Sequence, residues 1–254
     1  MKIYHLSIQV FCIITLTIAT LLSNSSSLLG ETRGYISSQL PKPPDTGTPS
    51  GNSTPATTRP QITCQETNKP LTALLANNGS DFTISEYPKF WFYIPYASKE
   101  ISYMEFLLLN GTERQTIYHT AVKLREQPGW IEIAIPAEPQ YALKVNENYR
   151  WRFNLDCEPD RRTEPDLVVN GWVRRIPLNP QLKNQLEAVK PQQYSIYRDN
   201  FIWYDAIALL AELHFAEPEN QEWSDAWANL WQSLDLPWVI QEPFADSELL
   251  PPES

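Results

Sequence analysis

The chain has 254 residues and a formal net charge of −10, with 30 acidic and 20 basic side chains. Such an acidic chain repels a phosphate backbone, so its charge excludes sequence-independent nucleic-acid binding as the main activity. Only 3 histidines and 8 glycines are present, which leaves little material for a histidine metal site or a glycine-rich phosphate loop.

Residues 1–30 have the organisation of a secretory signal peptide. Met1 and Lys2 give a positive start, residues 8–22 carry no charge, and a run of small polar residues follows. The uncharged run is shorter than the roughly 20 residues that a membrane helix needs. We expect cleavage between residues 23 and 30 and export to the periplasm or beyond. In the alternative, an uncleaved N-terminal anchor, this segment is the contact with the membrane.

Residues 31–63 are rich in proline, threonine, serine and glycine and contain few apolar side chains. A segment of this composition cannot bury enough apolar surface to fold. We therefore expect a disordered linker between the signal peptide and a folded domain.

Two cysteines remain once the predicted signal peptide and its Cys12 are removed. An even number of cysteines is typical of a protein that folds in an oxidising compartment. A bond between Cys64 and Cys157 would close a loop of about 90 residues and stabilise the domain by roughly 4–5 kcal/mol in the chain-entropy model. Two buried free thiols are the alternative.

Between residues 64 and 176, short apolar runs alternate with turn residues such as Asn77-Asn78-Gly79, Asn110-Gly111 and Pro128-Gly129. Many short strands without helical periodicity predict an antiparallel β-sandwich, which we expect to be immunoglobulin-like. The predicted strands are Leu71–Ala76, Phe82–Ser85, Lys89–Pro95, Tyr103–Asn110, Gln115–Leu124, Trp130–Pro136, Asn148–Cys157 and Val168–Ile176.

Two of these runs show how the strands are buried. In residues 149–155 the apolar side chains alternate with polar ones, so one face of that strand belongs to the core. In residues 90–94 both faces are apolar. This favours a central strand covered on both sides over a strand that presents aromatic rings to a partner.

The strand pattern stops at Pro177, and residues 177–240 predict a helical hairpin or bundle that packs on the sandwich. Asn179 before Pro180 is a typical helix start. One segment resembles half of a tetratricopeptide repeat, but no second copy follows at the expected offset. Residues 241–254 are acidic and contain proline, and we expect this tail to fray. The predicted helices are Leu178–Val189, Gln192–Asp199, Phe201–Phe215 and Gln221–Leu234.

The sequence predicts no catalytic residue, no metal ligand and no cofactor. His119 and His214 lie far apart on different kinds of element, and the motifs of serine hydrolases, zinc proteases and nucleotide-binding loops are absent. Carboxylates at strand ends (Glu132, Asp156, Glu158 and Asp160) lack a spacing typical of a glycosidase. The acidic segment 156–166 lacks the ligand spacing of a calcium loop.

Aromatic content is the most distinctive feature of the composition, with 9 tryptophans and 12 tyrosines. Most of these rings must be core, but an excess can stack on sugars or on an apolar patch of a partner. The candidate binding residues are Trp91, Tyr93, Tyr96, Trp130 and Trp172.

Several sequence blocks carry a resemblance to a known family. They are Leu71-Thr72-Ala73-Leu74, residues 85–96 (SEYPKFWFYIPY), Tyr149-Arg150-Trp151, Gly171-Trp172-Val173, Ile202-Trp203-Tyr204-Asp205-Ala206 and Leu210-Ala211-Glu212-Leu213. With the N-terminal signal and linker, this order resembles the cyanobacterial family called domain of unknown function 928, over roughly residues 64–236. The resemblance implies a cyanobacterial, secreted or periplasmic protein, and it brings no catalytic residues.

Three functions from different classes follow from these observations. We favour a non-catalytic protein-interaction module of the cell envelope, whose partner is another envelope or secreted protein. The alternative is a carbohydrate-binding module that uses exposed tryptophan and tyrosine on envelope polysaccharide. The third is an enzyme of a type that the sequence does not reveal.

Overall fold

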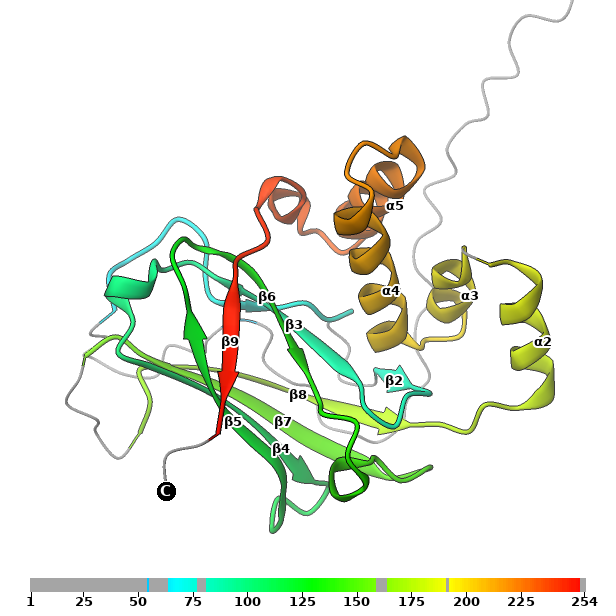
Figure 1. Ribbon diagram of the computed structural model, residues 1–254, viewed down its shortest axis with the longest axis horizontal. Helices are drawn as coiled ribbons and strands as arrows, with labels where there is room; N and C mark the ends of the chain where they lie inside the picture. Colours follow the sequence, from blue (N-terminus) through cyan, green and yellow to red (C-terminus); the bar gives the residue numbers. More distant parts are fainter. Residues whose placement is uncertain (1–53, 55–63, 77–80, 159–163, 191, 252–254) are drawn as a thin grey trace, which may run out of the picture. The chain divides into compact units, whose positions relative to one another are not determined.

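The alternating apolar runs of the sequence form two β-sheets in the computed structural model (Figure 1). The structure describes residues 54, 64–76, 81–158, 164–190 and 192–251. All of them belong to the second of two units into which the chain divides, residues 39–254. The predicted signal peptide lies outside the described residues, as do the predicted linker apart from residue 54, the turn at residues 77–79 and part of the acidic segment 156–166.

All eight predicted strands are confirmed. The smaller sheet has the order β1 (Thr72–Ala73), β3 (Lys89–Ile94) and β6 (Gly129–Ala134), and its pairs are antiparallel. The larger sheet has the order β2 (Phe82–Thr83), β8 (Leu167–Arg175), β7 (Asn148–Asp156), β4 (Tyr103–Asn110), β5 (Thr116–Leu124) and β9 (Ser247–Leu250).

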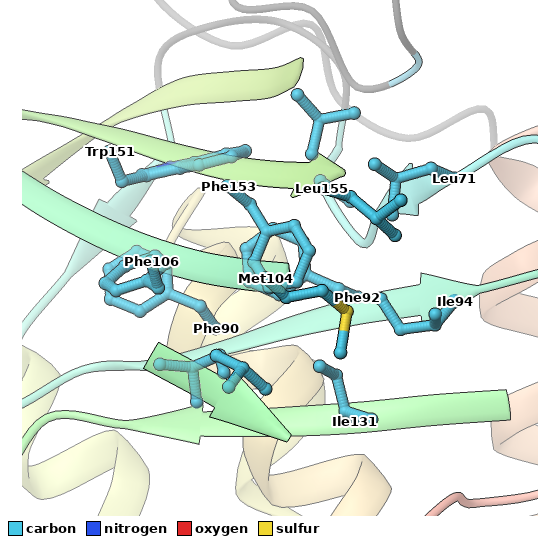
Figure 2. Packing of buried hydrophobic residues seen from close by; sticks show 14 of the residues in the cluster. Leu71, Phe90, Phe92, Ile94, Met104, Phe106, Ile131, Trp151, Phe153 and Leu155 are labelled. Carbon is cyan, nitrogen blue, oxygen red and sulfur yellow. The ribbon is translucent and has the colours of Figure 1, made fainter. Parts of the chain in front are cut away.

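The two sheets share one apolar core, which Figure 2 shows from close by. The predicted inward face of β7 is confirmed, because Trp151, Phe153 and Leu155 are fully buried. Phe92 of β3 stacks on Phe153 with ring centroids 4.5 Å apart. Phe106 of β4 lies opposite Phe153 in the antiparallel register of β4 and β7. Aromatic rings from both sheets therefore fill the space between them.

Gly171 of β8 makes room for the largest of these rings. It pairs with Trp151 across the sheet, and a Cβ added at Gly171 would lie 2.4 Å from the Trp151 ring. Any other residue at position 171 would have to displace this ring. Packing against Trp151, rather than a turn, therefore requires the glycine.

The α+β class is confirmed, but the immunoglobulin-like sandwich is not. The short strand β2 pairs parallel with β8, and β9 joins the larger sheet only after the chain has passed through the helices (Figure 1). Strand count and spacing, from which the sandwich was predicted, do not specify which strands pair.

The four predicted helices are confirmed as α2 (Pro180–Ala188), α3 (Gln193–Asp199), α4 (Trp203–Ala216) and α5 (Gln221–Ser233). The Asn179 side chain accepts a hydrogen bond from the Leu182 N–H at 2.9 Å, so the predicted start of α2 is also confirmed. None of the helices in the described part of the chain is long and apolar enough to cross a membrane.

Strand β3 is covered on both faces, as its all-apolar sequence predicts. Phe90, Phe92 and Ile94 face the larger sheet. Trp91 and Tyr93 belong to a second core that the smaller sheet forms with α4, α5 and the following 3₁₀ helix η3 (Pro237–Gln241). Helices α4 and α5 therefore dock on the smaller sheet, as a third layer of the described part of the chain. Helices α2 and α3 pack instead beside β2 and the end of β8, at the larger sheet.

The sequence predicts a frayed C-terminal tail, but residues 241–251, the part of it that the structure describes, are ordered against the sheets. Residues 247–250 form β9, which runs antiparallel to β5 (Figure 1), and the Thr120 hydroxyl donates to the Leu250 carbonyl at 2.7 Å. Ala245 is buried and Leu249 packs against the core between the sheets. These few apolar side chains and the open edge of β5 outweigh the acidic composition from which fraying was predicted.

A disulfide bond joins Cys64 and Cys157, with Cα atoms 5.1 Å apart. It confirms the predicted pairing and fastens the segment that precedes β1 to the end of β7. The bond thereby holds together two residues that are 93 positions apart in the sequence.

Candidate functional site

Four of the five predicted binding aromatics lie in the cores. Trp91, Tyr93 and Tyr96 are at most 5% exposed and Trp130 is fully buried. The Trp130 ring stacks on Trp231 and Trp238, and its indole N–H donates to the Val239 carbonyl at 3.3 Å. Binding through Trp91, Tyr93 or Trp130 would require the helical layer to move away, and Tyr96 is enclosed in the core between the sheets.

Trp172 differs, because its side chain lies on the outer face of the larger sheet and is partly exposed. The Arg150 guanidinium lies over its ring, 5.1 Å from the centroid. Arg150 also donates to the Asn170 side chain at 2.6 Å. These three side chains form a polar and aromatic patch, the Trp172 patch, with the composition of a sugar-binding surface.

A buried tyrosine joins α4 to the larger sheet. The Trp151 indole N–H donates to the Tyr204 hydroxyl at 2.7 Å, and this hydroxyl donates to the Trp172 carbonyl at 2.9 Å. The Tyr204 ring also packs edge-on against Phe90. Four of the blocks that carry the family resemblance therefore meet at Tyr204.

A cleft with a volume of about 200 Å³ opens beside Tyr204. Its walls come from the segment between β2 and β3, from α3 and from α4. Hydroxyl, amide and charged groups alternate with apolar ones along it. The lining residues are Thr83, Ser85, Tyr87, Pro88, Lys89, Gln193, Tyr197, Tyr204, Asp205, Ala208, Leu209 and Glu212.

Asp205 is the most deeply placed carboxylate of the cleft. It stands in the first turn of α4, where the helix dipole favours a negative charge. One of its oxygens accepts from the Ile84 backbone N–H at 3.3 Å. Burial raises the pKa of Asp205 to about 6, against hydrogen bonds from the Thr83 hydroxyl and the backbone that lower it. This carboxyl group therefore exchanges its proton close to neutral pH.

Lys89 lies at the rim of the cleft between two glutamates. Its ammonium is 2.5 Å from Glu212 on α4 and 3.3 Å from Glu132 on β6. Burial acts to lower the pKa of Lys89, but the hydrogen bonds and charges of the two glutamates together raise it above its usual value. Lys89 is therefore a permanent cation that joins β3 and β6 to α4.

A second carboxylate, Asp81, is buried behind the cleft and is only 2% exposed. Within the described residues one of its oxygens, Oδ1, has no hydrogen-bond partner. Burial raises the pKa of Asp81 to about 7, although a hydrogen bond from the Ala76 backbone lowers it. Its charge also acts on the Tyr204 hydroxyl. Asp81 and Asp205 therefore place two proton-exchanging groups around one tyrosine.

The two histidines are not part of the cleft. His119 forms a 2.8 Å hydrogen bond to Glu105 across β4 and β5. His214 stacks on Trp227, with ring centroids 5.4 Å apart, and burial lowers its pKa. They occupy separate places, as the sequence predicts.

Sequence reasoning missed Asp81, Lys89, Asp205 and Glu212 as site residues. The signal that could have found Asp205 is a carboxylate inside the apolar run FIWYDAIALL, where an acidic side chain needs partners from elsewhere in the fold. No comparable local signal marks Asp81, because it precedes a strand of only two residues.

The model of one protein family, described as Domain of Unknown Function (DUF928), matches residues 54–244 of the chain. No curated protein matches it. The matched range includes the disulfide, both sheets up to residue 244, the helices and every residue of the cleft.

Proposed function

The chain belongs to the DUF928 family, a domain of unknown function, and we propose that it is a non-catalytic protein-interaction module of the cell envelope. The proposal is drawn from the cleft. In this proposal the cleft receives a side chain of the partner, another envelope or secreted protein. The proposal includes a cyanobacterial source and export through the N-terminal segment. The Cys64–Cys157 bond supports export, because such bonds persist in oxidising compartments.

The observation that carries the proposal is the cleft itself. Its volume of about 200 Å³ is below the ~300–1,000 Å³ of usual small-molecule and cofactor sites. Its polar groups come from three different elements, and Tyr204 fastens α4 to the sheet beside them. An open cleft of this size, whose lining combines apolar surface with a few charged and hydroxyl groups, is suited to one long side chain of a protein partner.

The state of the charged groups favours binding over catalysis. Lys89 is held protonated by two glutamates, so it lacks the free amine of a nucleophile or base. Asp205 already accepts hydrogen bonds from Thr83 and from backbone groups, which fix its position. Groups that are paired in this way orient a ligand rather than attack it.

A pull-down with the full chain from envelope extract tests the proposal. We expect a specific envelope protein to be retained by the natural chain and lost with Ala208→Phe, which fills the cleft from α4. Glu248→Gln on the exposed side of β9 is the matched control and should retain the partner. Retention that Ala208→Phe leaves unchanged would contradict the proposal.

A carbohydrate-binding module is the second candidate, and the Trp172 patch favours it. Trp172 is the one predicted binding aromatic that is partly exposed, and it lies beside Arg150 and Asn170 on the open face of the sheet. We expect a sugar binder to retain envelope polysaccharide on a glycan array and to lose it with Trp172→Ala. Trp130→Ala is unsuited to this test, because it removes a core ring.

A further inference from the structure

The cleft holds more negative than positive charge. Asp205 and Glu212 line it from α4, and Lys89 is the basic residue of its lining. Lys89 is already paired with Glu212 and Glu132. Within the described residues, the partners of Asp205 are hydroxyl and N–H donors, and no lysine or arginine forms an ion pair with it. Asp205 is thus a partly buried carboxylate without a countercharge from the described protein.

The groups around Asp205 do not remove this imbalance. They are Asp81 before β2, Lys89 on β3, Glu132 on β6, Tyr197 on α3, and Tyr204 and Glu212 on α4. Lys89 is the one cation among them, and two glutamates neutralise it. The raised pKa of Asp205 agrees with this arrangement, because burial opposes the charged form and a cation within about 4–6 Å would restore it.

A metal ion fits the cleft less well than an organic cation. Calcium and magnesium need several oxygen ligands that converge on one point. In the described part of the chain, the group of three side chains close enough to share an ion is Cys64, Cys157 and Asp166, and its two sulfurs form the disulfide. Neither Asp205 nor Glu212 belongs to such a group.

We infer that the cleft takes a basic side chain of the protein partner, arginine in preference to lysine, with Asp205 as its anchor. This inference rests on the proposed function. Asp205 and Glu212 stand seven residues apart, so they lie on one face of α4, about 10 Å apart along its axis. A guanidinium at Asp205 can donate to the carboxylate and to nearby hydroxyls at once, and it gives up its water more readily than an ammonium does.

Fluorescence anisotropy with dye-labelled nonapeptides tests the inference on the full chain. The probes are glycine-serine peptides whose central residue is arginine, lysine, citrulline or glutamate. We expect the arginine peptide to bind best and the citrulline peptide, which keeps the shape but has no charge, to bind at least about tenfold more weakly. Binding of the arginine peptide should weaken between about pH 8 and about pH 5, as Asp205 takes up its proton.

Variants separate the anchor from the fold. Asp205→Asn should weaken binding of the arginine peptide about tenfold or more, and Glu212→Gln, at a half-exposed position, about two- to threefold. Glu248→Gln on β9 should leave it unchanged. Because Asp205 also accepts bonds from Thr83 and Ile84, Glu212→Gln provides the test in a variant whose folding is not at risk.

The outcomes distinguish this inference from the proposed function. If citrulline and arginine peptides bind equally, or if no peptide binds while Ala208→Phe still abolishes retention of the envelope partner, the cleft is an interaction site for a different side chain and the inference is wrong. If Ala208→Phe leaves partner retention unchanged, the proposed function fails, whichever peptide binds.

Discussion

The core between the two sheets differs in composition from the seam, the region where the helices meet the two sheets. Between the sheets, the buried side chains are aliphatic and aromatic, with the disulfide at one end. At the seam, tryptophans pack between the smaller sheet and α4 and α5, His214 stacks on one of them, and Asp81 and Asp205 are enclosed where α4 meets β2. Both regions exclude water, but in the described part of the chain the buried carboxylates whose pKa burial raises lie at the seam, whereas the groups shifted by burial in the core between the sheets are tyrosine hydroxyls.

This difference shows which region contains groups that lower the stability of the folded chain. An apolar core gains stability from every buried side chain, whereas a buried carboxylate without a cation lowers it. Carboxylates of this kind persist where they contact a ligand or orient an element. The seam, rather than the larger core, is therefore the part of the molecule to search for function.

The largest expected effect tests the apolar core through its disulfide. Cys157→Ser should lower the free energy of unfolding by roughly 4–5 kcal/mol, because the unfolded chain is released from a loop of about 90 residues. Urea unfolding of the oxidised chain and of the variant measures this effect. Reduction of the natural chain should reproduce it, and equal stabilities in both redox states would contradict it.

The next effect tests the seam through Asp81. Its pKa is raised in the folded state, so the unfolded chain releases the proton first as pH rises. The contribution of Asp81 to stability is thus greatest at low pH and is lost as pH rises from about 4 to about 7, by about 4 kcal/mol.

Asp81→Asn should remove the part of the pH dependence that comes from Asp81 and leave the part that comes from Asp205, and urea unfolding at about pH 5 and about pH 8 measures the difference. Asp225→Asn, at an exposed position on α5, is the matched control and should keep the natural pH dependence. If the stability of Asp81→Asn changes with pH as much as that of the natural chain, Asp81 does not titrate in the folded chain.

A smaller effect tests the N-terminal cap of helix α2. Asn179→Ala removes the side chain that accepts from the Leu182 N–H and should lower stability by about 1 kcal/mol. Thermal unfolding followed by circular dichroism measures this. The neighbouring exposed Gln181→Ala should change stability little, and an equal loss in both variants would mean that the cap does not contribute.

The smallest effect tests the ionic tie across the seam. Lys89→Met removes the pairs with Glu132 and Glu212, and because all three side chains are partly exposed, stability should fall by less than about 1 kcal/mol. The loss should shrink further at high salt. Urea midpoints at low and high salt check this, and a salt-independent loss would indicate a packing role of the lysine stem instead.

Local pattern was sufficient for the elements and for much of the packing. The alternation at residues 149–155 and the all-apolar run at residues 90–94 predicted which faces are buried, since the residues of each face belong to one strand. Local pattern was insufficient for the tail, because a strand of four residues forms only where a sheet edge is open to pair with it. Composition also could not show that four of the five aromatic candidates lie in the cores and Trp172 on a sheet face, because it does not tell a ring in a core from a ring on a surface.

The sequence by itself determined the strands before β9, the helices, their apolar faces and the cysteine pair, since these depend on neighbouring residues or on a count of two. Only the tertiary structure decided that Asp205 meets Ile84 across 121 residues and that Glu212 meets Lys89 across 123. Periodicity describes how a segment buries its own face. Which distant segment covers that face, and which charges are enclosed with it, follows from packing of the whole domain.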